Sequence, residues 1–338
     1  MQPLNAVEWR DDHLEVIDQT LLPERLEILK LTSAGDVVDA IRRLAVRGAP
    51  AIGASAAFGV VLGLQEGIPL ERLVDALGAA RPTAVNLRWA VDRVARAART
   101  GRTAVQMHEG ALAEALDIWN EDRDACRRIG EHGRAELVSV RRVLTHCNTG
   151  RLATTGIGTA LGIVYAKAEA GEPVEVVATE TRPSLQGARL TAWELTHAGI
   201  PVTLISDAAS GAALSSGRID AVVLGCDRVA RNGDVANKVG TYTLAVLARA
   251  SGIPFYVAGP VSSFDPDTPD GTGIVVEERP AEELLRVRGV PVAPDVTVWN
   301  PVFDITPAEL VTAFITDAGV LRPPFGESIA AAMSTRGK

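Results

Sequence analysis

The chain has 338 residues, of which 47% are hydrophobic and only 4% aromatic, and its net charge is −8 at pH 7. This length exceeds one ordinary hydrophobic core, so we expect two domains or one large α/β domain. Lysine and arginine are spread along the chain without a basic cluster, which argues against a nucleic-acid partner. No apolar run reaches the ~20 residues that cross a bilayer, which argues against a membrane-bound protein.

Residues 6–31 carry short apolar–polar alternations, such as "LEVID" and "RLEILKL", that predict a small antiparallel sheet. From about residue 34 apolar residues recur at spacings of three and four, as in "AGDVVDAIRRLAV", "PAIGASAAFGVVLGL" and "AVNLRWAVDRVARAA". This period is typical of amphipathic helices. The sequence therefore predicts a mostly helical domain with a small sheet over residues 1–135.

Beyond residue 135 the apolar runs become short and β-branched, and helical stretches separate them. The six runs are "RRVLTHCNTG", "VEVVATETRP", "PVTLISD", "DAVVLGCD", "PFYVAGP" and "VTVWNPVFD". Strands that alternate with helices indicate parallel βαβ units. Residues 136–338 are therefore predicted to form a doubly wound, Rossmann-like domain with a parallel sheet, and the chain as a whole to be α/β.

Polar residues follow several of these runs, at the ends where doubly wound sheets bind ligands. Cys147 and Asn148 follow the first run, Asp207 the third and Asp227 the fourth. Helix capping explains such positions equally well, because Asp, Asn and Ser are preferred N-caps. At Asp207 we favour a capping or orienting role over catalysis.

Cys147 lies between His146 and Asn148, which makes it either a proton carrier or a small buried hydrophobic residue. Of the five histidines only His146 follows a predicted strand, so no Ser-His-Asp triad can be assembled and a hydrolase is disfavoured. The cysteines are three in number and form no CxxC pair, which predicts reduced thiols in a cytoplasmic protein. No metal-ligand motif is present, and no metal is expected.

Two glycine-containing segments are candidate anion sites. The glycines after the first run, in "HCNTGRLATTGIG", do not have the GxGxxG spacing of a dinucleotide fingerprint, so we infer no NAD. In "VRGAPAIG", Arg47, Gly48 and Ala49 lead into a predicted helix whose free amides would favour an anion. A plain turn between helices is the alternative.

An ordered set of motifs resembles the methylthioribose-1-phosphate isomerases from about Val7 to Arg322. The motifs are "RGAPAIGASAAFG", "RPTAVNLRWAVDR", "THCNTG", "ETRPSLQGARLTAWEL", "GCDRVARNGDVANKVGTYTLAVLA" and "NPVFDITPAELVTAFITDAGVLRP". The wider superfamily includes ribose-1,5-bisphosphate isomerase and the α, β and δ regulatory subunits of initiation factor 2B. The resemblance implies a homodimer that binds a sugar phosphate and needs no cofactor.

The resemblance also implies roles for individual residues. The family's catalytic residues fall on Asp227, as proton donor, and on Cys147, as second acid/base or transition-state stabiliser. Its substrate-binding residues fall on Arg47, Gly48, Ala49, Arg81, Gln186, Asn237 and Lys238. Cys226 and Thr149 stand where the family often has Ala, and Ser184 where Leu is more usual. The implied reaction converts 5-methylthioribose 1-phosphate to 5-methylthioribulose 1-phosphate.

Two alternatives stay open. The same residues would serve an isomerase of another pentose 1-phosphate, such as 5-deoxyribose 1-phosphate or ribose 1,5-bisphosphate. A regulatory subunit that binds a phosphorylated metabolite without converting it is the other. We expect such a subunit to lack the pair Cys147 and Asp227, which this chain keeps.

Overall fold

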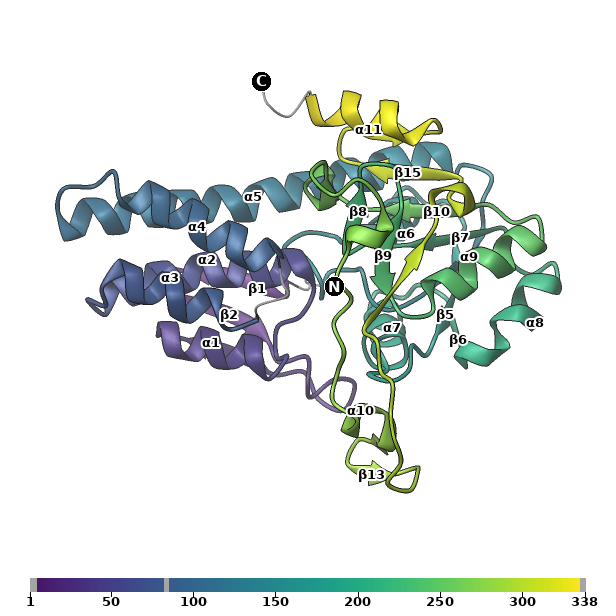
Figure 1. Ribbon diagram of the computed structural model, residues 1–338, viewed down its shortest axis with the longest axis horizontal. Helices are drawn as coiled ribbons and strands as arrows, with labels where there is room; N and C mark the ends of the chain where they lie inside the picture. Colours follow the sequence, from purple (N-terminus) through teal and green to yellow (C-terminus); the bar gives the residue numbers. More distant parts are fainter. Residues whose placement is uncertain (1–4, 82–84, 335–338) are drawn as a thin grey trace. The chain divides into compact units, whose positions relative to one another are not determined.

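A computed structural model describes residues 5–81 and 85–334 (Figure 1). It divides into two compact units, the first of residues 1–126 with 149–158 and the second of residues 127–148 with 159–338. The predicted domain boundary between residues 135 and 136 remains a prediction. The segment 149–158 groups with the first unit because its backbone is bonded there: Leu152 O accepts from Gln19 Nε2 at 2.7 Å, and Ala153 O from Ala51 N at 3.2 Å.

The first unit is mostly helical and has a small antiparallel sheet, as predicted. The sheet is ordered β1 (Val7–Arg10), β2 (His13–Ile17) and β3 (Ile28–Leu31). The helices are α1 (Ala34–Arg42), α2 (Ala49–Gln65), α3 (Leu70–Gly78), α4 (Val85–Ala98) and α5 (Ala104–Glu136), which continues into the second unit. Helix α2 is apolar on all sides and packs against α1, α3 and α4, so it forms the centre of this unit.

Local sequence explains where these helices begin. Ser33 and Asp36 form a capping box at α1, in which each side chain accepts a hydrogen bond from the other residue's backbone N–H at 3.0 Å. Gly48 precedes α2 with a φ of +93°, and a Cβ there would lie 2.4 Å from Ala153 O. Only glycine therefore fits the start of α2.

The second unit contains a largely parallel seven-stranded sheet, which confirms the Rossmann-like prediction. Its spatial order is β16 (Gly319–Leu321), β15 (Ala313–Thr316), β10 (Phe255–Ala258), β7 (Ala221–Leu224), β4 (Arg142–Thr145), β5 (Glu175–Thr179) and β6 (Val202–Ile205). Only β16 is antiparallel to its neighbour. The helices are α6 (Ala160–Glu169), the π-helix η1 (Gly187–Thr191), α7 (Ala192–His197), α8 (Ser210–Ser215), α9 (Thr241–Ala250) and α11 (Phe325–Ser334).

One predicted strand is placed differently. The run "VTVWNPVFD" was expected in the parallel sheet, but its end forms β14 (Phe303–Thr306), which pairs antiparallel with β9 (Val235–Lys238). These strands belong to a separate sheet ordered β11 (Phe264–Asp265), β8 (Arg228–Ala230), β9 and β14. Strand β15 occupies the place in the parallel sheet that was predicted for this run. All four of its residues, AFIT, are buried. Trp299, in the first half of the predicted run, is 75% exposed.

Aromatic rings fill the interior on one side of β15. Phe314 meets Phe264 and Phe325 edge-on, with ring centroids 5.3 and 4.8 Å apart. Edge-to-face pairs of this kind stabilise beyond the area that they bury. They fix α11 and β11 to the sheet through one residue of β15.

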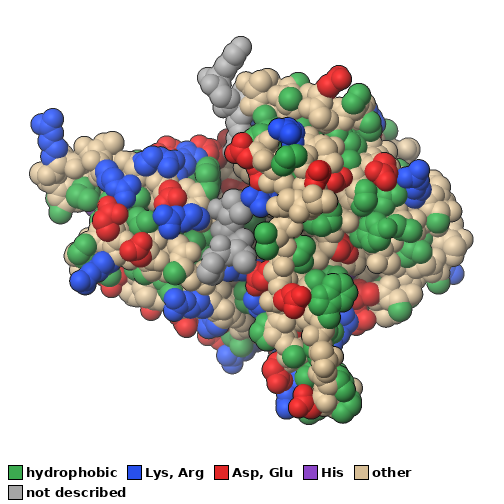
Figure 2. Space-filling model, viewed as in Figure 1, with side chains coloured by type: hydrophobic (Ala, Val, Ile, Leu, Met, Phe, Trp, Pro, Cys, Tyr) green, Lys and Arg blue, Asp and Glu red, His purple; other side chains and the backbone are tan. Residues whose placement is uncertain are grey.

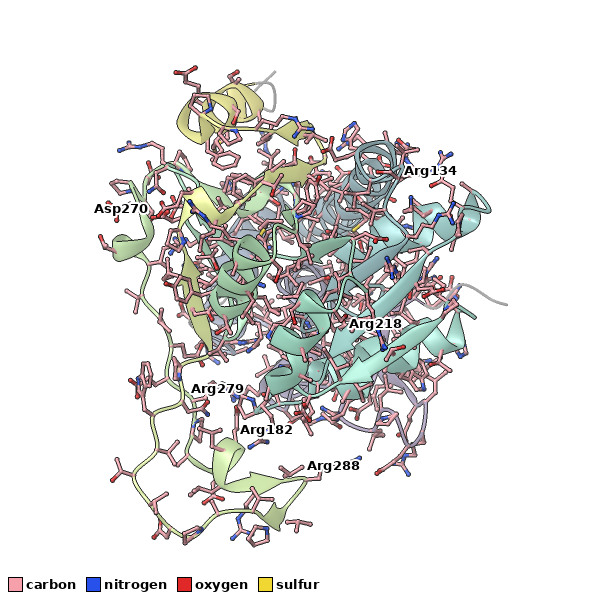
Figure 3. The ribbon with its side chains drawn as sticks, turned by 90° about the vertical axis from the view of Figure 1, so that its right-hand side faces the viewer. Arg134, Arg182, Arg218, Asp270, Arg279 and Arg288 are labelled. Atoms are coloured by element: carbon pink, nitrogen blue, oxygen red, sulfur yellow. The ribbon has the colours of Figure 1, made fainter. Side chains whose placement is uncertain are left out.

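An arm of the second unit spans residues 275–300 and carries α10 (Glu282–Leu285), β12 (Arg286–Val287) and β13 (Val290–Pro291). Figure 2 shows hydrophobic side chains on its surface, and the large exposed ones are Val275, Val290, Val292, Val296 and Trp299. Arg182 and Arg279 lie beside α10 (Figure 3). Arg182 Nη2 donates to Leu284 O at 3.1 Å, which ties the arm to the loop after β5.

Candidate active site

The strand order of the parallel sheet reverses between β4 and β7. From β4 the chain proceeds outward through β5 to β6, and it then resumes at β7 on the other side of β4. Cys147 follows β4 and Asp227 follows β7. Doubly wound sheets bind their ligands outside the carboxyl ends of the strands at such a reversal. The two predicted catalytic residues therefore follow the two strands at which a ligand is expected.

Cys147 has an unusual backbone conformation, with a φ of +62°. Its N–H donates to Thr181 Oγ1 at 2.8 Å, and its carbonyl oxygen accepts from Thr191 Oγ1 at 2.6 Å. A side-chain-bearing residue in the left-handed region carries strain that persists only where neighbours hold it, and such residues cluster at functional sites. The two threonine hydroxyls provide that hold, and they fix the direction of the Cα–Cβ bond that carries the thiol.

Thr181 is itself left-handed, with a φ of +64°. Asp207 holds it, because its carboxylate accepts from the backbone N–H of Thr181 at 2.8 Å and of Arg182 at 2.7 Å. The side chain of Ser206, which precedes the short helix at Asp207, makes no capping bond. Asp207 therefore has the orienting role, and through Thr181 it acts on Cys147.

Asn148 is tied into a buried polar network that the sequence did not reveal. Its Nδ2 donates to Glu194 Oε2 at 3.1 Å and to Thr191 Oγ1 at 3.2 Å, while Tyr165 donates its hydroxyl to Glu194 Oε1 at 3.0 Å. Glu194 is 2% exposed. The sequence offered one indication of this network. Glu194 stands between the hydrophobic residues Trp193 and Leu195, and a carboxylate that is buried there needs hydrogen-bond partners.

The segment after Asp227 is a β-hairpin. Strands β8 and β9 pair, and Asp227 N donates to Ala236 O at 3.0 Å. Asn237 and Lys238 end β9, and both are buried. Asn237 Nδ2 donates to Thr241 Oγ1 at 2.9 Å, and Lys238 Nζ lies 5.5 Å from the ring centroid of Phe303.

Two hydrogen bonds join these predicted residues into one region. In the first, Asp227 N donates to the carbonyl oxygen of Ala236, the residue before Asn237. In the second, Nε2 of His146, the residue before Cys147, lies 2.9 Å from the carbonyl oxygen of Val239, the residue after Lys238. Cys147 and Lys238 are therefore joined through their sequence neighbours, and Asp227 is joined to the residue before Asn237. The structure brings these four predicted residues together within the second unit.

Gln186 belongs to the same unit, in the loop between β5 and η1. Its Oε1 is buried and accepts no hydrogen bond from the residues that the structure describes. The next residue must be glycine, because a Cβ at Gly187 would lie 1.7 Å from Thr179 O. A buried, unpaired amide oxygen is suited to a hydroxyl donor.

The other four predicted residues belong to the first unit. Arg47 and Gly48 precede α2, and Ala49 is its first residue. The backbone amides at this helix start favour an anion. Arg81 follows α3 and directly precedes residues 82–84, which lie outside the described part of the chain.

Cys226, which stands where the family often has Ala, packs against Gly259. Burial, together with the negative charge of Asp227, raises the pKa of its thiol to about 12. A Cβ at Gly259 would lie 2.4 Å from the Cys226 sulfur, so the thiol fills the space above that glycine. A neutral, packed thiol is not a second acid or base at neutral pH.

Cys226→Ala is therefore expected to keep kcat/KM within about threefold of the unsubstituted enzyme. The free energy of unfolding should fall by about 1 kcal/mol, because a partly buried sulfur that packs against Gly259 is lost. Steady-state kinetics and urea denaturation measure the two effects. A loss of kcat/KM beyond about tenfold would assign Cys226 a part in the reaction.

Residues 5–81 and 85–334 contain neither a metal-binding cluster nor a membrane-spanning helix. Within these ranges the His, Cys, Asp and Glu side chains form no group of three or more that could hold a metal ion. No helix there combines the length and the apolarity that crossing a membrane requires.

Comparison with known proteins gives consistent matches over nearly the whole chain. The model of the initiation factor 2 subunit family matches residues 45–323. A methylthioribose-1-phosphate isomerase of Desulforudis audaxviator is 52% identical, over 98% of this chain and 99% of that protein. A 5-deoxyribose 1-phosphate isomerase of Moorella thermoacetica is 47% identical, over 97% of both chains. The crystal structure of 5-methylthioribose 1-phosphate isomerase from Pyrococcus horikoshii is 40% identical and superposes with a TM-score of 0.93, over 99% of this chain and 97% of that one.

Proposed function

Because this chain belongs to the initiation factor 2 subunit family, we propose that it acts as one of that family's aldose–ketose isomerases. The substrate is 5-methylthioribose 1-phosphate and the product 5-methylthioribulose 1-phosphate, a step of methionine salvage. One observation carries the proposal: a cysteine in a strained backbone and an aspartate follow the two strands at which the sheet order reverses. A chain that only binds a metabolite has no need for that pair.

The chemistry requires groups of these kinds. Phosphate on C1 blocks ring opening at the anomeric hydroxyl, so the ring oxygen must receive a proton from the enzyme. A hydrogen must also move from C2 to C1, either through an enolate-like intermediate or as a direct hydride. We assign Asp227 as the proton donor and Cys147 as the second acid/base or the stabiliser of the reacting carbons.

The substrate-binding assignments follow charge and hydrogen-bonding capacity. Arg47, Arg81 and Lys238 supply positive charge for the phosphate, and Gly48 and Ala49 supply the amides at the start of α2. The remaining two residues, Gln186 and Asn237, are suited to sugar hydroxyls, because amide groups both donate and accept.

Arg81→Ala is expected to raise KM about 30-fold, because a charge-assisted bond to phosphate is lost, while kcat changes little. Arg72→Ala is the matched control, since Arg72 is an exposed arginine of α3 in the same unit. Initial rates over a range of substrate concentrations give both constants. Equal KM values for the two variants would remove Arg81 from the site.

The substrate experiment separates the candidate functions. The purified protein is incubated in turn with 5-methylthioribose 1-phosphate, 5-deoxyribose 1-phosphate and ribose 1,5-bisphosphate, and ketose formation is followed. The highest kcat/KM is expected for the methylthio sugar. The similarity to the Moorella thermoacetica protein favours the 5-deoxy sugar as the second candidate. Binding without ketose formation from any of the three would support a regulatory subunit.

The remaining features of the proposal come from the resemblance and the composition. We infer a cytoplasmic homodimer that uses a sugar phosphate and that requires no cofactor, nucleic acid or membrane. The three cysteines are free thiols, in keeping with a reducing compartment. Sedimentation of the purified protein measures the oligomeric state.

A further inference from the structure

The turn between β9 and α9 directly follows Asn237 and Lys238, and the side chain of His146 contacts it. His146 Nε2 lies 2.9 Å from Val239 O, and because a carbonyl oxygen only accepts, Nε2 carries the proton. His146 Nδ1 is then the acceptor for the hydroxyl of Thr179, at 2.6 Å. One imidazole therefore connects the ends of β4 and β5 to the end of β9.

The ring packs so closely on this turn that the turn must contain glycine. Gly240 has a φ of +107°, and a Cβ at this position would lie 2.9 Å from His146 Cε1 and 3.0 Å from Nε2. A larger residue would be strained and would also overlap the ring. The ring of His146 thus meets the carbonyl oxygen of Val239 and leaves no room for a side chain at residue 240.

Asp304 holds the same turn by accepting hydrogen bonds from the backbone amides of the turn. Its Oδ2 accepts from Gly240 N at 2.7 Å, and its Oδ1 accepts from Tyr242 N at 3.1 Å, at the start of α9. Strand β14 brings it there, since Asp304 pairs with Asn237 and Phe303 with Lys238. A carboxylate at a helix N-terminus is stabilised by the helix dipole.

The side chain of His146 is buried and that of Asp304 is partly buried. Burial raises the pKa of Asp304 to about 6, so its carboxylate form is retained at neutral pH. Burial, with the charge of Lys238 nearby, lowers the pKa of His146 to about 4. His146 is therefore a neutral ring, and hydrogen bonds within the protein engage both of its nitrogens.

We propose that His146 and Asp304 are positioning residues, which together fix the β9–α9 turn so that Asn237 and Lys238 keep the orientation that binds substrate. The inference rests on the proposed function for the role of Asn237 and Lys238. Neither positioning residue is assigned a contact with the substrate. Loss of either should therefore affect substrate binding more than the chemical step.

A pair of substitutions at His146 tests the inference. The amide nitrogen of Gln can occupy the position of Nε2, whereas that of Asn reaches only the position of Nδ1. His146→Asn is expected to raise KM about tenfold, with little change in kcat, because the bond to Val239 O is lost. His146→Gln should restore KM to within about threefold of the unsubstituted enzyme. His197→Asn, at the end of α7, controls for loss of a histidine elsewhere in the unit.

Amide hydrogen exchange over residues 235–250 provides a measurement that needs no substrate. Exchange in the turn should become about tenfold faster in His146→Asn and remain near its original rate in His146→Gln. Equal exchange and equal KM in the two variants would overturn the inference. Failure of the unsubstituted protein to convert any sugar phosphate would instead contradict the proposed function, while the exchange rates would still test the positioning role.

Asp304→Asn is the second variant and provides the test if His146→Asn does not fold. The Asn side chain keeps one acceptor oxygen where Asp had two, so one of the two hydrogen bonds from the turn's backbone N–H groups is lost. Faster exchange at Gly240 or Tyr242, together with a raised KM, is the expected result. Unchanged exchange and unchanged KM would show that Asp304 does not position the turn.

Discussion

Asp227→Asn is expected to lower kcat about a thousandfold and to leave KM within a few-fold of its original value. The amide has the size of the carboxyl group but does not deliver a proton to the ring oxygen. Substrate contacts are retained, so the loss belongs to the chemical step. Ketose formation at saturating substrate measures it, and near-UV circular dichroism verifies the fold.

The neighbouring Cys226→Ala is the control for this substitution, because it alters the same strand end without removing a predicted catalytic group. If Asp227→Asn folds normally and turns over within a few-fold of the unsubstituted enzyme, Asp227 is not the proton donor. A large rise in KM with unchanged kcat would make Asp227 a binding residue instead.

Cys147→Ser is expected to lower kcat about a hundredfold. A hydroxyl group nearly matches the thiol in size but does not ionise in the neutral range, so acid/base capacity is lost. The free energy of unfolding should change by less than about 1 kcal/mol, because the left-handed backbone and its two threonine partners remain. Single-turnover rates and urea denaturation give the two quantities.

Cys147→Ala separates the two roles left open for this residue. An acid/base role would leave Ala and Ser equally slow, because neither side chain exchanges a proton as readily as a thiol, whereas a stabiliser that donates a hydrogen bond would leave Ser faster than Ala. Turnover close to that of the unsubstituted enzyme in both variants would make Cys147 a packing residue only.

The sequence predicted those parts of the fold that depend on local pattern. Helical spacing identified the first unit, and five of the six short apolar runs became strands of the parallel sheet. The sixth run was misplaced, because "VTVWNPVFD" and "AFIT" are both short and β-branched, and only tertiary pairing distinguishes them. Strand ends then predicted where Cys147 and Asp227 lie.

The supporting residues were beyond prediction for a different reason. The roles of His146, Glu194 and Asp304 depend on which distant backbone or side-chain atom each one meets, and spacing along the chain does not encode that. His146 and Val239 are 93 positions apart, and Asp304 and Gly240 are 64 apart. The assignment of Arg81 rests on the resemblance, whereas Arg47 was also a candidate from its place before a predicted helix start.

The grouping of residues 149–158 with the first unit bears on how this protein is made. The chain passes between the units after residues 126, 148 and 158, so neither unit is a continuous stretch of the gene. During synthesis the first unit lacks the partners of Gln19 and Asp122 until that segment has left the ribosome. By then Cys147 has already been synthesised. A gene cut after residue 135 would encode an incomplete first unit, and exchange of domains between relatives would have to transfer the segment 149–158 with it.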